Sequence, residues 1–395
     1  MPKQFTYTIL IHYSEIALKK NNRNFFEKIF INNIKTHIKN LPYKKIYLKA
    51  ARIFISDIHK SDWKIFKKIL RNVMGLKNAT LMIESDTSIE NLMTISEEVI
   101  SQMNFETYRI STKRHDKSLP FDSQDINIKV GQHIQNLTNK PVNLKYPDIN
   151  IIIELLQDKS FVGVDQILGY SGLPANCQEK ALSLISSGID SPVASFEMIK
   201  RGVNLDYVHF HSYPSTSMQS IDNVKKILIV LSSYQLKSNL FLVPLLEIQQ
   251  GIMAQIPDKY WVIFFRRYMI KIANDLSKKN NAVAIITGDS VGQVASQTLS
   301  NIRAVSAISQ LPILRPLAGY NKEDIINKAK KINTYDISIE PYQDCCSFFV
   351  PPHPETKARM NQIDFLENKL DLKETYNKTL NNIEKCTFNY EDTLL

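Results

Sequence analysis

The chain has 395 residues, enough for two or three domains, and 44% of them are hydrophobic, enough to fill real cores. Its net charge is +10, but residues 1–80 alone carry 17 Lys and Arg against 4 Asp and Glu, so the basic excess lies at one end. The sequence shows neither a signal-peptide pattern nor the roughly 18 consecutive apolar residues of a membrane helix, so we expect a globular, cytoplasmic protein that contacts no membrane.

Two mixed regions precede residue 167. In residues 1–60, the pattern predicts a strand (FTYTILIHY), a helix (FFEKIFINNIKTHI) and two short strands (KIYLKA, ARIFIS). In residues 61–166 it predicts the helices WKIFKKILRNV and IENLMTISEEVISQM and the strands NATLMIES, TYRISTKR and INIIIELLQDKSFVGVD. The concentrated positive charge favours a module that meets phosphates, and a lysine-rich solvated surface is the alternative.

Residues 167–180 are predicted to be a linker because GYSGLPANCQ is rich in small, turn-forming residues. Residues 181–395 then alternate continuous apolar strands (ALSLIS, VNLDYVHF, NLFLVPL, AVAIITG, LPILRPL) with helices such as YWVIFFRRYMIKIANDL. Such strands predict a parallel sheet covered on both faces. Residues 358–395 are predicted to form polar helices, in which Cys386 is an ordinary cysteine.

The segment LISSGIDSPVAS, residues 184–195, forms the first turn from strand to helix in that sheet. Ser191 suits the N-cap, Pro192 suits the first helical position, and Gly202 can end the helix. Backbone N–H groups at such a turn bind anions, and Asp190 among them suggests Mg²⁺ carried on a nucleoside triphosphate. The GK[ST] ending of a Walker A loop is missing, and an ordinary capped turn is the alternative.

The run SSGIDS resembles the SGGxDS loop of ATP pyrophosphatases, which cleave ATP to an adenylate and pyrophosphate. Other segments resemble the tRNA 4-thiouridine synthetase (tRNA uridine 4-sulfurtransferase) family: YSEIALKKNNRNFFEK, KRHDKSLPFDSQDIN, LKYPDINIIIEL, HFHSYPSTS, TGDSVGQVASQTL, LPILRPL and YDISIEPYQDCCSFFVPPHP. The resemblance implies a ferredoxin-like domain (1–60), a THUMP domain (61–166) and a Rossmann-like pyrophosphate-loop domain (181–395) that modifies uridine-8 of tRNA. It also carries a link to thiamine biosynthesis.

By the same resemblance, Asp190 and Cys346 are the expected catalytic residues. The expected ATP-binding residues are Leu184, Ile185, Ser186, Gly188, Ser191, His209, Phe210, Arg266, Gly288 and Gln297. Lys19, Lys20 and Arg23 are candidates for tRNA phosphate contacts. From the residues alone, Arg266 is as well explained by a surface charge and Gln297 by a cap. A histidine after an apolar strand is usually a core residue, but we favour a binding role for His209 because ligands of open α/β sheets bind at strand ends.

Two departures from the family leave questions open. Ser187 stands where the loop usually has glycine, and its Cβ narrows the approach of phosphate unless φ is negative. The chain stops 49 residues after Cys346, which is too short for the rhodanese-like domain of longer members, so a cysteine desulfurase or another donor must supply the sulfur. The four cysteines form no CxxC pair, which argues against a disulfide framework and a structural metal site.

Several alternatives remain. The chain could be another pyrophosphate-loop tRNA-modifying enzyme, although the paired N-terminal modules and the Cys345-Cys346 placement count against this. It could instead be a tRNA-binding protein with a decayed active site, at which Ser187 hints. A homodimer is also left open.

Overall fold

The computed structural model describes residues 5–115, 121–157, 159–341, 349 and 351–393. The chain divides into two compact units, residues 1–174 (unit 1) and 175–395 (unit 2), each with its own internal contacts. No helix among the described residues is both long enough and apolar enough to cross a membrane.

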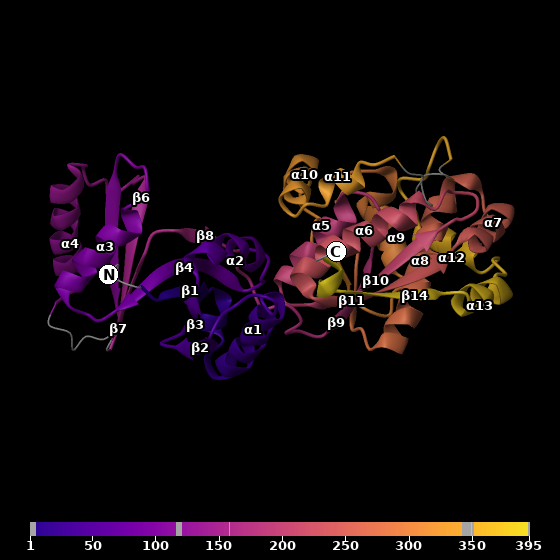
Figure 1. Cartoon of the computed structure of the whole chain (residues 1–395). Helices are drawn as coiled ribbons and strands as arrows, with labels where there is room; N and C mark the ends of the chain where they lie inside the picture. Colours follow the sequence, from indigo (N-terminus) through magenta and orange to yellow (C-terminus); the bar gives the residue numbers. More distant parts are fainter. Residues whose placement is uncertain (1–4, 116–120, 158, 342–348, 350, 394–395) are drawn as a thin grey trace. The chain divides into compact units, whose positions relative to one another are not determined.

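The first half of unit 1 consists of antiparallel strands and two helices (Figure 1). Its elements are β1 Tyr7–Tyr13, α1 Arg23–His37, β2 Lys45–Lys49, β3 Arg52–Ile58, α2 Trp63–Leu70 and β4 Leu76–Ser85. Nearly every residue of β1 and β3 is buried, which explains why both segments form apolar runs in the sequence. Strand β1 lies between β3 and β4 in the sheet. All six elements agree in type and order with the sequence prediction.

The second half of unit 1 continues the same sheet. Its elements are α3 Ile89–Ile100, β5 Tyr108–Arg114, α4 Ser123–Thr138, β6 Ile149–Leu156, β7 Lys159–Gly163 and β8 Gln166–Leu168. The strand order is β2-β3-β1-β4-β7-β6-β5, with β8 paired to β4, and α3 and α4 pack together beside β5 and β7. The sequence prediction missed α4, which starts at a capping box formed by Asp122 and Asp125.

A buried carboxylate joins the two halves of unit 1. Glu154 of β6 is fully buried and forms an ion pair with Arg52 of β3, while its Oε1 lies 2.9 Å from His12 Nε2 in β1. His115 lies 3.2 Å from the other carboxylate oxygen. Burial would raise the pKa of Glu154, but these neighbours outweigh it and hold the pKa well below its usual range.

Unit 2 is built on the predicted parallel sheet, with strand order β13-β12-β9-β10-β11-β14. Its first half contains β9 Lys180–Leu184, α5 Asp190–Lys200, β10 Asn204–His211, α6 Gln219–Gln235, β11 Lys237–Pro244, α7 Leu246–Gln255 and α8 Trp261–Asn280. Its second half contains β12 Ala284–Ile286, α9 Leu299–Ser306, β13 Ile313–Leu314, α10 Lys322–Lys331, α11 Tyr335–Ser338, α12 Met360–Glu367, α13 Lys373–Asn381 and β14 Glu384–Asn389.

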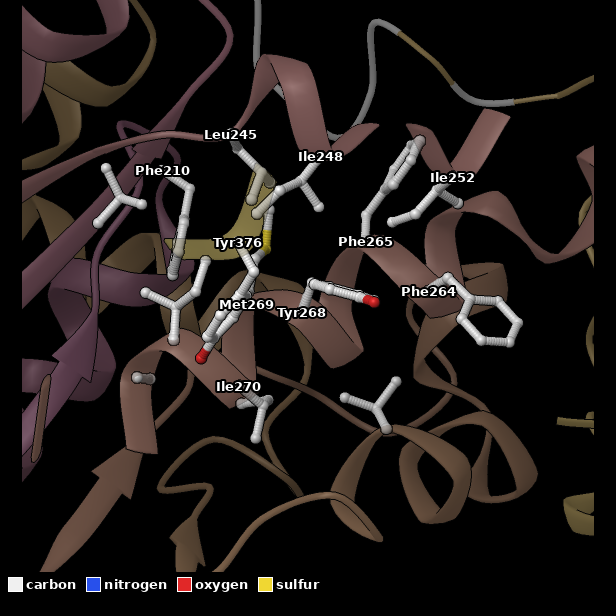
Figure 2. Close-up of a cluster of buried hydrophobic side chains, with 14 of the residues drawn as sticks. Phe210, Leu245, Ile248, Ile252, Phe264, Phe265, Tyr268, Met269, Ile270 and Tyr376 are labelled. Atoms are coloured by element: carbon white, nitrogen blue, oxygen red, sulfur yellow. The ribbon is translucent and has the colours of Figure 1, made fainter. Parts of the chain in front are cut away.

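Helices cover both faces of this sheet, as predicted. On one face α5 packs against α6 and α10, and on the other α8 packs against α7, α9 and the strands β9 and β12. Figure 2 shows the core on the α8 side, where Phe210 of β10 lies among Leu245, Ile248 and Tyr376. Because side chains alternate along a strand, the neighbours of Phe210 in β10 face the α5 and α6 side.

The prediction of polar helices for residues 358–395 is wrong at its end. Residues 384–389 form β14, which pairs antiparallel with β11 and therefore ends the parallel sheet with an antiparallel edge strand. Phe388 of β14 is buried, whereas most other residues of the strand are exposed or half-buried. So short a segment with one buried position carries little periodic signal, and pairing with β11 decides its structure.

Candidate active site

The loop between β9 and α5 is held in a tight turn by its own serines. Ser186 N donates to Ser191 Oγ at 2.8 Å, and the two hydroxyl oxygens lie 3.1 Å apart. Helix α5 begins at Asp190 with Ile189 as its N-cap, which has no side-chain capping bond, so the prediction of Ser191 as N-cap is wrong. The Ser191 hydroxyl instead closes the loop, and Gly202 follows the helix with φ of 81°, as predicted.

The end of β12 touches this loop. A Cβ built on Gly288 would lie 2.8 Å from Ser191 N and 2.9 Å from Ser191 Cα, so only glycine fits there. Ser187 is not among the described residues with positive φ, so its Cβ causes no backbone strain. Since β9 and β12 are adjacent parallel strands whose connections run to opposite sides, the loop and Gly288 flank the switch point where open α/β sheets bind ligands.

Asp190 is held by two residues that come from elsewhere in unit 2. Lys322 is the first residue of α10, and its Nζ lies 2.6 Å from Asp190 Oδ1. Gln293 Nε2 donates to Asp190 Oδ2 at 2.9 Å. The Asp190 side chain retains 22% exposure. The sequence reasoning identified Asp190 but missed Lys322 and Gln293, because their separation in sequence gives no sign that they meet.

A second acidic centre lies beyond Gly288. Asp289 is 5% exposed and accepts from Arg266 Nη2 at 2.5 Å, Arg315 Nε at 3.1 Å and Thr287 Oγ1 at 2.9 Å. Burial raises the pKa of Asp289, but Arg266 above all, with Thr287 and Arg315, brings it below its usual value. The Asp289 carboxylate is therefore ionised, and it fixes the guanidinium groups of Arg266 and Arg315 near the carboxyl end of β12.

The predicted residues Arg266, Gly288 and Gln297 thus gather around Asp289. Arg266 Nη1 also donates to Ser296 O at 3.0 Å, and Gln297 Nε2 lies 3.5 Å from Asp289 Oδ1 while its Oε1 is buried without a partner. Gln297 is the last residue of a short 3-10 helix that precedes α9. Asp289 was missed although it stands in the TGDS segment, whose aspartate after an apolar strand was the available signal.

Four further predicted residues lie at the carboxyl ends of β9 and β10. His209 Nδ1 lies 2.9 Å from Ile185 O, and because a carbonyl only accepts, Nδ1 carries the proton. Burial lowers the pKa of His209 to about 4, so the ring is neutral near pH 7 and its buried, unpartnered Nε2 offers a lone pair. Leu184 is half-buried beside the core, whereas the Phe210 ring lies inside it (Figure 2).

The predicted phosphate contacts lie in unit 1, at the start of α1. Lys20 is exposed, and Lys19 Nζ lies 4.9 Å from the centre of the Phe26 ring. Arg23 is bound within the fold instead, since its Nε donates to Glu27 Oε1 at 2.8 Å and to Tyr13 Oη at 3.0 Å. Its guanidinium therefore neutralises a buried carboxylate.

The cysteines are divided between described and undescribed residues. Cys345 and Cys346, the expected sulfur-handling pair, lie outside the described residues. Cys177 is buried, and Cys386 is a free thiol, half-buried in β14. Among the described residues, no cluster of three or more His, Cys, Asp and Glu side chains could hold a metal ion.

Comparison with known protein families matches three models in chain order. The ferredoxin-like domain of ThiI matches residues 8–80, the THUMP domain matches residues 87–165, and the thiamine biosynthesis protein (ThiI) model matches residues 176–372. The first model extends past residue 60 and so includes α2 and part of β4, whereas the prediction placed these elements in the next domain.

The relatives that match over nearly the whole chain are named probable tRNA sulfurtransferases. A probable tRNA sulfurtransferase of Listeria monocytogenes serotype 4a (strain HCC23) is 34% identical over 389 residues, which cover 98% of this chain and 96% of the relative. The probable tRNA sulfurtransferase of Acetivibrio thermocellus is 37% identical over 385 residues, which cover 96% of this chain and 98% of the relative. A solved 4-thiouridine synthetase, in complex with RNA and ATP, is 31% identical with a TM-score of 0.87 and covers 97% of this chain and 100% of its own. The chain therefore belongs to the tRNA sulfurtransferase (ThiI) family.

Proposed function

We propose that this chain uses ATP to convert uridine-8 of tRNA to 4-thiouridine. The observation that carries the proposal is the meeting of Asp190, Lys322 and Gly288 at the loop between β9 and α5, called the serine loop below. This meeting places one carboxylate, one ammonium and a helix N-terminus at the carboxyl end of the parallel strands. The solved 4-thiouridine synthetase in complex with RNA and ATP supports the same substrates.

ATP is proposed to bind across the ends of β9, β10 and β12. Backbone N–H groups around Gly188 and Ser191 would hold the phosphates, while the bond from Ser186 N to Ser191 Oγ and the close approach of Gly288 shape the loop. His209 Nε2 is an acceptor that fits the exocyclic amino group of adenine. Arg266, held by Asp289, and Gln297 would lie beside the nucleotide.

Mg²⁺ enters this proposal as part of the substrate. Mg²⁺ typically binds one or two protein carboxylates together with substrate phosphates and water, so the Asp190 carboxylate fits a magnesium–ATP complex although no larger cluster of metal ligands is found among the described residues. In that complex Asp190 would exchange its contact with Lys322 for the metal ion, which frees the Lys322 ammonium for a phosphate oxygen.

The proposed chemistry has two steps. The C4 oxygen of uridine-8 attacks the α-phosphate, pyrophosphate leaves, and an adenylated uridine forms. A sulfur nucleophile then attacks C4 and AMP leaves. The charges at the loop would stabilise the negative charge that accumulates on the phosphate oxygens in the first transition state.

Cys346 is proposed to carry the sulfur as a persulfide received from a cysteine desulfurase or another donor. Its outer sulfur attacks C4 as AMP leaves, which links Cys346 to the base through an S–S bond. A second thiolate, from Cys345 or an external thiol, then attacks Cys346 Sγ, so that the S–S bond breaks, 4-thiouridine is released, and the resulting disulfide is reduced by external thiol. A thiolate near the adenylate is required for such transfer, and Cys345 and Cys346 follow the last strand of the parallel sheet most closely in sequence. Unit 1, with its basic N-terminal region, is proposed to hold the tRNA.

The decisive experiment is nucleoside analysis of tRNA incubated with the chain, ATP, Mg²⁺ and a desulfurase with cysteine. We expect 4-thiouridine together with stoichiometric AMP. A different thionucleoside would favour another pyrophosphate-loop enzyme, and tRNA binding without any AMP would favour a binding protein with a decayed site.

A further inference from the structure

A second group of buried polar atoms lies beside the proposed ATP site, around the carboxyl end of β10. His211 ends this strand, and its Nδ1 is buried without a hydrogen-bond partner. Thr216, in the connection to α6, is 2% exposed, and its Oγ1 also lacks a partner. Asn223, in the second turn of α6, is fully buried, and its Nδ2 is unpartnered as well.

The fold brings these residues to one place. His211 is two residues beyond His209 in β10 and so shares its face of the sheet, opposite to the face that carries Phe210. Helix α6 packs on β10 and follows it as the return helix of a parallel crossover, so its N-terminal turns lie near the carboxyl end of β10. His211 and His209 are also close enough for the charge of one to lower the pKa of the other.

The free atoms form a complementary set of hydrogen-bonding groups. Gln219 Nε2 donates to Asn223 Oδ1 at 2.7 Å, which occupies the acceptor of that amide and leaves its NH₂ as a donor. Burial lowers the pKa of His211 and keeps its ring neutral near pH 7. The Thr216 hydroxyl can donate or accept, so the group suits an uncharged ligand with both donors and acceptors.

We propose that His211, Thr216 and Asn223 form a subsite for the edge of a nucleobase, an inference that rests on the proposed function. An uncompensated buried polar group destabilises a fold, and three of them beside a ligand-binding edge call for a polar ligand. The Tyr213 ring, 52% exposed between His211 and Thr216, offers a face on which a base can stack. The base is either the adenine of ATP or the target uridine of tRNA.

The test is Thr216→Val in the full chain, which removes the hydroxyl at nearly constant volume. Thr8→Val is the matched control, because Thr8 is also fully buried with an unpartnered Oγ1 but lies in β1 of unit 1. Loss of one neutral hydrogen bond should lower kcat/KM for one substrate about threefold to tenfold. Thr216→Ser, which keeps the hydroxyl, should restore it.

To decide whether the base is the adenine of ATP or the uridine of tRNA, kcat/KM is measured while the concentration of each substrate is varied in turn. The affinity for ATP with Mg²⁺ is measured by calorimetric titration. A loss in kcat/KM and affinity for ATP assigns the subsite to adenine, and a loss confined to kcat/KM for tRNA assigns it to uridine. The proposal is overturned if Thr216→Val and Thr8→Val both stay within twofold of wild type. It is also overturned if both substrates are affected equally and Thr216→Ser does not help.

Failure of the proposed activity would look different. If the wild-type chain forms no 4-thiouridine, the proposed function is wrong. The subsite can still be tested by measuring the binding of ATP and of unmodified tRNA to the wild-type and Thr216→Val chains. Equal affinities of the two chains for both ligands would then overturn it.

Discussion

Lys322 Nζ lies 2.6 Å from Asp190 Oδ1, although 132 positions separate the two residues. The contact joins the start of α10 to the start of α5, directly at the serine loop. It therefore places a positive and a negative side chain where the phosphates of ATP are proposed to bind.

We first predict that Asp190→Ala abolishes adenylation, with at least a hundredfold loss of AMP formation, and leaves tRNA affinity nearly unchanged. A group that positions the metal and phosphates acts mainly in the transition state, so turnover suffers more than binding. AMP release and tRNA titration measure the two effects. The control is Asp364→Ala on the exposed side of α12, and normal 4-thiouridine formation by Asp190→Ala would exclude Asp190 from the mechanism.

Lys322→Met should lower AMP formation about tenfold to a hundredfold, because one charge-assisted contact to a phosphate oxygen is lost in the transition state. Rates of AMP formation at saturating ATP and tRNA measure this effect. Lys378→Met is the control, since Lys378 also pairs with a carboxylate, at 2.7 Å from Glu247, but on α13. Equal rates for the two variants would show that Lys322 serves only as a counter-ion.

Asp289→Asn should destabilise the chain by about 3–5 kcal/mol at pH 7, because two partly buried guanidinium groups lose their shared counter-charge. The pKa of Asp289 is depressed in the folded state, so its contribution is full above the unfolded value of about 4 and is lost as pH falls through the lower folded value. Urea denaturation of the wild-type and Asp289→Asn chains at pH 7 and near pH 3 should therefore show a difference in the free energy of unfolding that becomes smaller in acid. A difference independent of pH would contradict this account.

The basic residues before and at the start of α1 should separate into two classes. Lys20→Ala should leave stability unchanged and reduce the log-log salt slope of tRNA binding by about one unit or less. Arg23→Ala should cost about 1–3 kcal/mol of stability, because Glu27 loses a charged donor while its side chain is only 5% exposed. Thermal denaturation and tRNA titration from low to high salt distinguish the two, and an unchanged slope for Lys20→Ala would remove it from the interface.

With a desulfurase as donor, Cys346→Ser should stop thiolation and leave AMP formation intact, because serine cannot form a persulfide. Cys386→Ser is the matched control and should change little, since Cys386 lies in the edge strand β14. If Cys346→Ser thiolates tRNA normally with both a desulfurase and free sulfide, then sulfide attacks the adenylate directly and the cysteine has no catalytic role.

The sequence by itself determined most of the architecture. Continuous apolar strands between helices fixed a parallel sheet covered on both faces, and small residues around Asp190 after the first strand located the loop. These features are encoded locally, by periodicity and by the backbone freedom of the turn, so they can be read without knowing what packs against them. The quoted motifs identified the family for the same reason.

Only the tertiary structure decided which residues meet. The pairing of Asp190 with Lys322 and the two arginines around Asp289 join segments that no periodicity relates. Arg23 pairs within the fold because the buried Glu27 carboxylate lies beside it. Residues 384–389 form a strand because β11 offers an open edge with which they pair. Long-range pairing depends on how the elements pack, and one sequence alone does not contain that information in a local pattern.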